Sequence, residues 1–148
     1  MTRLADAFAK RAAAGQKALV AYLCVGDPSL DESVELALAA AEAGADVLEL
    51  GVPFSDPTAD GPTIARAAQR AIRNGATLAG VLDVARRVRA RVATPIVLFT
   101  YYNPVLAGGE AAVAARARDA GVDALLVVDL PPEESASLRQ AARAAGLA

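Results

Sequence analysis

The sequence has no histidine and no tryptophan, and only one cysteine and two lysines among its 148 residues. Without histidine, a Ser-His-Asp triad, a histidine-bound zinc ion and a histidine acid-base pair are excluded within these residues. The single cysteine, Cys24, excludes an internal disulfide and a cysteine-held metal cluster, which suits a reducing, cytoplasmic setting. Lys10 and Lys17 both precede the first predicted strand, so a barrel with a Schiff-base lysine lacks its nucleophile. Carboxylates and phenols are the groups left for catalysis.

The charge pattern also gives little reason to expect a nucleic acid or a membrane as partner. The net charge is −2, and no apolar run reaches the roughly 20 residues that a membrane span needs. Leu4, Phe8 and Ala12 recur at helical spacing, which predicts an amphipathic helix packed under a barrel rather than a signal peptide. One basic cluster occupies 86–91, and we interpret it as a solvated helix end, with a phosphate or RNA patch as the alternative.

Short apolar segments alternate along the chain with segments of helical periodicity. The predicted strands are 18–25, 47–52, 96–102 and a fourth that follows Asp123. The helix signals between them are a capping box of Ser29 and Glu32, a start at Gly61 and Pro62, a stop at Asn74 and Gly75, and a cap at Thr77. Asn103 and Pro104 are predicted to turn the chain out of the third strand.

A weak internal repeat supports this organisation. Residues 43–48 (AGADVL) recur as 120–125 (AGVDAL), an offset of 77 residues that equals two strand-helix units. Near-continuous apolar strands followed by helices are typical of a parallel α/β sheet, here four βα units plus an N-terminal helix. Four units are half of a TIM (β/α)8 barrel, which typically needs about 250 residues. We therefore expect residues 1–148 to be a single domain, a truncated half-barrel whose outer strand edges need a partner. A doubly wound open sheet is the alternative.

The segment 49–62 contains the most informative chemistry, because Glu49 interrupts an apolar strand and Asp60 closes the loop after it. Alternate residues of a strand share a face, so Val47, Glu49 and Gly51 are predicted to point into the barrel. A buried carboxylate costs several kcal/mol unless something compensates for it. Glu49 and Asp60 are therefore a candidate catalytic pair, and a structural ion pair or a solvated strand end is the alternative.

The whole run from Glu49 to Pro62 resembles the signature of the tryptophan synthase alpha subunit family, E-L-G-[IV]-P-F-S-D-P-x-A-D-G-P, and every fixed position is present. The resemblance implies a lyase of tryptophan biosynthesis that cleaves indole-3-glycerol phosphate into indole and glyceraldehyde 3-phosphate by a retro-aldol reaction. It implies no organic cofactor and no metal in this subunit. By the same resemblance, Glu49 would protonate the indole ring carbon and then accept the side-chain hydroxyl proton, and Asp60 would bind the indole N–H.

The resemblance extends to two further sets of positions. Family positions that line the indole pocket match Tyr22, Phe99, Tyr101, Leu126 and Val128, for which core packing is the alternative. Family positions that contact or couple to the beta subunit, a pyridoxal-phosphate enzyme, match Pro53, Asp56, Asn103 and Asp129. An alpha2-beta2 heterotetramer is the expected assembly. Asp56 is also a good turn former, and Asp129 could instead cap the helix that follows the fourth strand. The aromatic at position 22 is usually Phe in the family, so the Tyr22 hydroxyl is a departure.

The resemblance covers all 148 residues but only about the first half of the family's chain. The phosphate-binding loops of such barrels follow strands seven and eight and are absent here, so substrate binding is expected to be weak. Two interpretations follow: a lyase represented by part of its chain, or a non-catalytic half-barrel that serves as a folding or interaction module.

Overall fold

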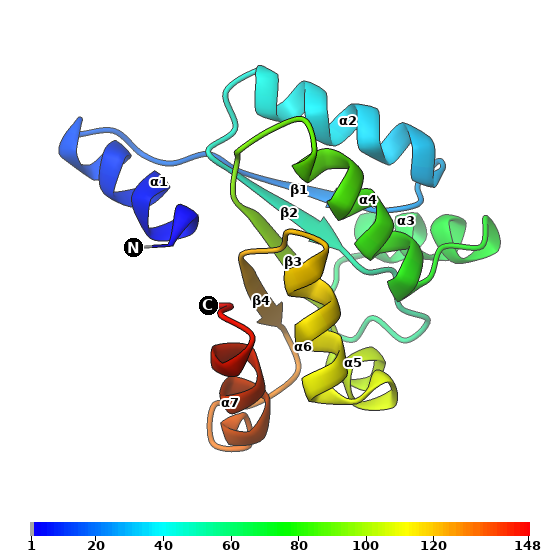
Figure 1. Ribbon diagram of the computed structural model, residues 1–148. Helices are drawn as coiled ribbons and strands as arrows, with labels where there is room; N and C mark the ends of the chain where they lie inside the picture. Colours follow the sequence, from blue (N-terminus) through cyan, green and yellow to red (C-terminus); the bar gives the residue numbers. More distant parts are fainter. Residues whose placement is uncertain (1) are drawn as a thin grey trace.

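The computed structural model describes residues 2–148, which form one parallel sheet covered by helices (Figure 1). The strands are β1 (Val20–Cys24), β2 (Val47–Gly51), β3 (Ile96–Thr100) and β4 (Ala124–Val127). The helices are α1 (Arg3–Ala13), α2 (Leu30–Glu42), α3 (Pro62–Arg73), α4 (Leu78–Arg89), α5 (Tyr102–Gly108), α6 (Glu110–Asp119) and α7 (Ala136–Ala144). Each predicted strand is therefore present, with ends shifted by one or two residues.

The sheet is wound in one direction. Its strand order, β1-β2-β3-β4, is the order of the chain, and every neighbouring pair is parallel. Residues of α2, α4 and α6 share a single apolar cluster with the outward side chains of the sheet, so these helices cover the same face. A doubly wound sheet would reverse its order and carry helices on both faces. The predicted βα-barrel wall is confirmed, and the doubly wound alternative is wrong.

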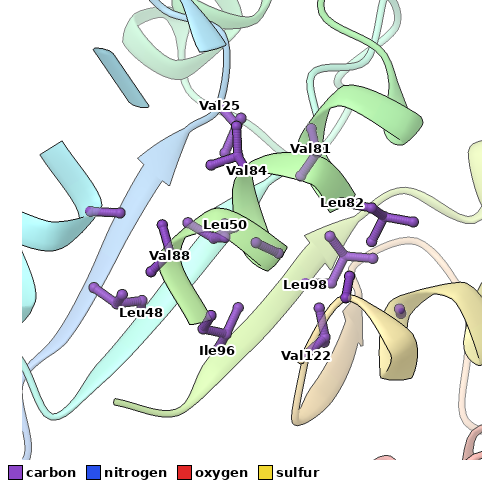
Figure 2. Close-up of a cluster of buried hydrophobic side chains, with 14 of the residues drawn as sticks. Val25, Leu48, Leu50, Val81, Leu82, Val84, Val88, Ile96, Leu98 and Val122 are labelled. Carbon is purple, nitrogen blue, oxygen red and sulfur yellow. The ribbon is translucent and has the colours of Figure 1, made fainter. Parts of the chain in front are cut away.

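The core lies between β2 and β3 on one side and α4 on the other (Figure 2). Leu48 and Leu50 of β2 alternate with Glu49 and are fully buried, as are Ile96 and Leu98 of β3. Their partners on α4 are Val81, Leu82, Val84, Ala85 and Val88. Burying a Leu or Val side chain contributes about 1.5–3 kcal/mol, so this face supplies most of the stability. The prediction that Leu48 and Leu50 pack against helices is confirmed.

The opposite, inner face of the sheet is only partly covered. Leu4 of α1 packs on Val47, Val97 and Ala124 near the amino ends of the strands. The predicted amphipathic helix is confirmed, although α1 itself buries none of its residues. Across residues 2–148, no helix combines the length and the apolar character needed to cross a membrane.

The helix signals of the sequence function as predicted at two starts. The Ser29 hydroxyl accepts the Glu32 N–H at 3.1 Å and donates to the Glu32 carboxylate at 2.8 Å, which satisfies a free helix donor. Thr77 accepts the Gly80 N–H at 3.2 Å at the start of α4.

The segment after β3 differs from the prediction. Asn103 and Pro104 do not turn the chain but lie in the first turn of α5, where proline is tolerated because its missing N–H is not needed. The strand β3 accordingly ends at Thr100. Two helices, α5 and α6, connect β3 to β4, just as α3 and α4 connect β2 to β3.

The arginines at 86–91 form ion pairs within the protein rather than a binding patch for an anionic ligand. Each is paired with an acid: Arg86 with Asp83, Arg87 with Asp31, Arg89 with Asp123 and Arg91 with Glu35. The predicted solvated helix end is thus a set of ion pairs that links α4 to α2 and to the sheet.

The 77-residue repeat has a structural meaning at the amino end of the sheet. Asp46 accepts the backbone N–H of Leu19 at 2.9 Å, and Asp123 accepts that of Ile96 at 2.9 Å. Each aspartate thereby ties the start of its own strand to the start of the preceding strand. Arginines complete both sites: Arg11 contacts Asp46, and both Arg3 and Arg89 contact Asp123. The two ion pairs from Arg3 and Arg11 also fix α1 beneath the inner face.

We expect Asp123→Ala to be among the most destabilising substitutions of a charged residue in the chain. Asp123 is 4% exposed, and its loss leaves the largely buried Arg89 without its charge partner. Removing one member of a buried pair costs about 3–5 kcal/mol. Urea unfolding should show this loss, whereas Asp119→Ala on the exposed end of α6 should change stability by no more than about 0.5 kcal/mol. Equal effects of the two substitutions would contradict the assignment.

Asp46 predicts a pH dependence of stability. The pKa of Asp46 lies below its usual 3.8 because the Leu19 N–H donates to the carboxylate and Arg11 lies beside it. A lowered folded-state pKa means that the stabilisation is complete above the unfolded pKa and is lost as pH falls through the folded one. The stability difference between the parent and Asp46→Asn should therefore stay constant down to about pH 5 and shrink below about pH 4. Urea titrations across this range test it, and a difference that persists to about pH 2 would refute it.

Candidate active site

The inner face of the sheet carries the predicted functional side chains in two neighbouring rows. In the first row Glu49 lies between Tyr22 of β1 and Val97 of β3. In the second row Gly51 lies between Cys24 and Phe99, and Leu126 of β4 pairs with Phe99. The parallel register therefore brings residues from all four strands together at the carboxyl side of the sheet, where barrel enzymes carry their active sites.

Glu49 is half-buried in the middle of β2 and has no protein partner. Among residues 2–148, no side chain or backbone group forms a hydrogen bond or ion pair with its carboxylate. It lines a hollow of about 320 Å³ together with Leu4 and Phe8 of α1 and several apolar strand residues. The structural ion pair that was one alternative does not form within residues 2–148, and Glu49 lies in the middle of β2 rather than at its end. A carboxyl group between apolar walls and free of partners is able to exchange a proton with a bound molecule.

Asp60 is positioned by a phenol from the neighbouring strand end. The Tyr101 hydroxyl donates to the Asp60 carboxylate at 3.0 Å and accepts the Ala59 N–H at 2.9 Å. Tyr101 itself is buried, and burial is the main cause that raises the pKa of its phenol, with Asp60 adding to the effect. The phenol therefore remains protonated and orients the loop that carries Asp60. Glu49 and Asp60 differ in that the strand holds the first and side-chain contacts hold the second.

Phe54 is a member of this cluster that the sequence did not reveal. Its ring stacks on Tyr101 with centroids 5.1 Å apart and planes at 29°. The loop after β2 is thus attached to the end of β3 by an aromatic contact and by two hydrogen bonds. The signature contains Phe54, but nothing in its spacing shows that it stacks on Tyr101, because the contact joins positions 47 residues apart in the chain.

Tyr22 fits onto the inner face because position 51 is a glycine. A Cβ at Gly51 would lie 2.4 Å from the Tyr22 hydroxyl, so the phenol occupies the space above Gly51. The Tyr22 ring meets Phe99 edge-on, with centroids 5.2 Å apart and planes at 74°. Burial, then the neighbouring Cys24 and Asp60, raise the pKa of the Tyr22 phenol. Its hydroxyl is therefore a neutral group on the inner face of the sheet.

Cys24 lies beside Tyr22 but is not a nucleophile. Burial, with smaller contributions from Asp27 and Asp60, raises the pKa of its thiol to about 11. The thiolate is the reactive form of cysteine, and it is scarce at neutral pH at this position. The single cysteine is thus a small residue at the end of β1, within the predicted strand 18–25.

The remaining predicted pocket residues are less enclosed. Phe99 is half-buried, and Val128 follows β4 with its N–H donating to the Thr100 carbonyl at 3.1 Å. Leu126 is 37% exposed, since β4 is an edge strand of the sheet formed by residues 2–148. Tyr22, Phe99, Tyr101, Leu126 and Val128 thus line one side of an open wall rather than a closed pocket.

The four predicted partner-contact residues lie at the carboxyl ends of the strands. Pro53 and Asp56 are in the loop after β2, and Ser55 donates to the Asp56 carboxylate at 2.5 Å. Asn103 is exposed on α5. All four therefore share the end of the sheet at which Asp60 lies.

Asp129 has a capping role, but at a different helix from the one predicted. Its carboxylate accepts the Tyr102 N–H at 2.7 Å at the start of α5. The helix after β4 is α7, which begins at Ala136 and receives no side-chain cap. The prediction that Asp129 caps the helix after strand four is wrong, because its side chain reaches back to the end of β3.

Metal-ligating side chains do not gather in the part of the chain that the structure describes: no three of its Cys, Asp or Glu residues lie close enough to hold an ion.

Comparisons with known proteins agree with the fold. A family model described as tryptophan synthase alpha chain matches residues 8–148. The tryptophan synthase alpha chain of Burkholderia thailandensis is 55% identical over 148 residues, which is 99% of this chain and 55% of that one. The corresponding chain of Citrifermentans bemidjiense is 50% identical over 147 residues, again 99% of this chain and 55% of the relative.

Solved structures give the same result. The alpha subunit of tryptophan synthase from Legionella pneumophila superposes with a TM-score of 0.96 at 38% identity, covering 99% of this chain and 56% of that one. An aminoacrylate-bound tryptophan synthase from M. tuberculosis superposes with a TM-score of 0.95 at 37% identity, covering 99% and 60%. The chain thus spans about half the length of the curated relatives it matches.

The parallel sheet and its one-sided helical cover define part of a TIM-barrel protein. The chain belongs to the tryptophan synthase alpha chain family.

Replacing Tyr101 with Phe should loosen the loop that carries Asp60. The substitution removes the hydrogen bonds to Ala59 and Asp60 but keeps the ring that stacks on Phe54. Amide exchange at Ala59 should accelerate by about fivefold or more, since a net hydrogen bond contributes about 1 kcal/mol. Tyr102→Phe is the matched control, because that phenol bonds Glu110 away from the loop. If Ala59 exchanges equally fast in both variants, Tyr101 does not hold the loop.

Proposed function

We propose that the protein to which this chain belongs is a lyase that cleaves indole-3-glycerol phosphate into indole and glyceraldehyde 3-phosphate. The observation that supports this most directly is Glu49, a carboxyl group without a partner among apolar side chains on the inner face of the sheet. Family membership supports the same reaction. No observation favours the alternative, a half-barrel that serves only as a folding or interaction module.

In this proposal the two acids have separate roles. Glu49 protonates the indole carbon that bears the side chain and accepts the proton of the adjacent side-chain hydroxyl as the carbon-carbon bond breaks. Asp60 accepts a hydrogen bond from the indole N–H and stabilises the positive charge that develops on the ring. The Tyr101 hydroxyl supports this by keeping the Asp60 carboxylate oriented. Each acid-base role contributes about 10²- to 10⁴-fold to the rate.

The apolar rows of the inner face suit an indole ring. Phe99 and Tyr22 already meet edge-on, and a planar ring can pack against such aromatic edges and faces. Tyr101, Leu126 and Val128 extend the apolar wall toward β4. No metal or organic cofactor has a role in the proposed reaction of this subunit.

We further propose that the carboxyl end of the sheet docks on a beta subunit that holds pyridoxal phosphate, in an alpha2-beta2 assembly in the cytoplasm. Pro53, Asp56, Asn103 and Asp129 lie at this end. Two contacts attach the docking segments to the carboxyl end of β3. The backbone N–H of Tyr102 donates to Asp129, and the ring of Phe54 stacks on Tyr101. A partner that moved one segment would therefore act on the loop of Asp60.

Indole release from indole-3-glycerol phosphate tests the proposal, measured with and without an added beta subunit. Glu49→Gln and Asp60→Asn should each lower the rate by at least about 10²-fold, because each removes a proton-transfer or charge-stabilising group. Glu42→Gln, at the exposed end of α2, is the matched control and should leave the rate unchanged. Near-normal turnover in Glu49→Gln would refute its role, and an inactive parent chain would refute catalysis by these 148 residues alone.

A further inference from the structure

Asp60 lies two residues before the start of helix α3, so the placement of that helix sets the placement of the carboxylate. Gly61 is the residue that precedes the helix, and Pro62 is its first residue. Gly61 has no side chain with which to cap α3, and among the described residues the Tyr101 hydroxyl is the one side-chain group that bonds Asp60. The backbone of Asp60 therefore follows whatever holds α3 against the sheet.

Apolar packing holds α3 only weakly. Its buried residues are Ala67, Ala68 and Ala71, whereas α4 buries three valines, a leucine and an alanine. Burial contributes about 25 cal/mol per Å², so three methyl groups supply much less than the larger side chains of α4. Polar contacts consequently make up a larger share of what fixes α3.

Those polar contacts join the far end of α3 to the loop that follows β1. Arg70 donates from Nε to Asp27 Oδ1 at 2.9 Å and from Nη2 to Asp27 Oδ2 at 2.6 Å. Asn74 donates from Nδ2 to the Pro28 carbonyl at 2.6 Å. The two-point contact of guanidinium and carboxylate fixes direction as well as distance, which a lysine could not do. The Arg70 hydrogen bond also lowers the pKa of Asp27, so the pair is charged at neutral pH.

The backbone at this junction is packed closely enough to make the contact specific. A Cβ at Gly26 would lie 3.1 Å from that of Ala71 and 2.5 Å from that of Ala76. Gly26 also has a φ of 98°, a conformation that favours glycine. The loop after β1 and the end of α3 therefore meet with only the methyl groups of Ala71 and Ala76 between them.

We propose that Arg70 is a positioning residue for Asp60, acting through helix α3. Arg70 and Asn74 fix one end of α3 to the loop after β1, Tyr101 holds the loop at its other end, and the 12-residue helix between them transmits the placement to Asp60. The functional meaning of this role rests on the proposed function, in which Asp60 binds the indole N–H. The geometric role does not depend on it.

The experiment follows the Tyr101 hydrogen bond in the chain itself. With ring-labelled tyrosine, NMR reports the Tyr101 signal, which Tyr101→Phe assigns and Asp60→Ala displaces to the position without the bond. Arg70→Ala should shift this signal toward the position seen in Asp60→Ala. It should also accelerate amide exchange at Ala59 by about twofold to fivefold, the range that exposed ion pairs reach.

Arg87→Ala is the matched control. Arg87 pairs with Asp31 between α4 and α2, an exposed ion pair of the same kind that does not touch α3. The Arg87→Ala substitution should therefore leave the Tyr101 signal unchanged. An unchanged signal in Arg70→Ala, or an equal shift in Arg87→Ala, would overturn the proposal. The charge-exchanged variant with Asp27→Arg and Arg70→Asp should restore the parent signal, which a loss of general stability would not do.

A second variant covers the case in which Arg70→Ala does not fold. Arg70→Lys keeps the charge but loses the two-point contact, so it should shift the signal part of the way, and no shift would refute the role. The proposed lyase activity is tested by a separate measurement, so the two proposals can be told apart. A shifted signal in an inactive chain supports the positioning role and refutes catalysis by these 148 residues alone, whereas full activity with an unshifted signal supports that catalysis and refutes the positioning role.

Discussion

The packing of helices on one face of the sheet is the constraint on which the rest of the structure depends. Leu48, Leu50, Ile96 and Leu98 are fully buried against α2, α4 and α6, and they alternate with the residues of the inner face. A shift of the register by one residue would expose these side chains and turn Glu49 into the core. The energy of the outer core therefore fixes which side chains face inward. The functional residues contribute almost nothing to this energy, which leaves them free to serve chemistry.

The carboxylates along the sheet are accommodated in ways that differ with their position. At the amino ends of the strands, Asp46 and Asp123 are each saturated by a backbone N–H and by arginines, so they lock strands together. Further along, Glu49 lies in the hollow without any such partner. Carboxylates along the same sheet thus have different roles. The number of hydrogen-bond donors around each carboxylate explains the difference. A saturated carboxylate stabilises the fold, and an unsaturated one is available to a ligand.

Much of the fold could be predicted from the sequence, because it depends on local patterns. The strands, the cap at Thr77 and the inward direction of Glu49 follow from periodicity and from short motifs. Contacts between residues far apart in the chain could not be predicted. Asp129 carries a capping side chain, but its choice of α5 over α7 depends on where the end of β3 lies. Likewise, nothing local to Phe54 or Arg70 reveals the partner that each finds more than 40 residues away.

The two candidate catalytic acids are therefore held by different kinds of interaction. Glu49 is fixed by the ladder of β2, which pairs with β1 and β3 and buries both neighbouring leucines. Moving it would require the core to repack. Asp60 is fixed by single contacts: a phenol, an aromatic stack on its loop, and a helix packed largely by alanines. The hydrogen bond and the aromatic stack each contribute about 1 kcal/mol and can break separately. The loop can thus shift Asp60 without disturbing Glu49, whereas a shift of Glu49 would disturb the outer core as well.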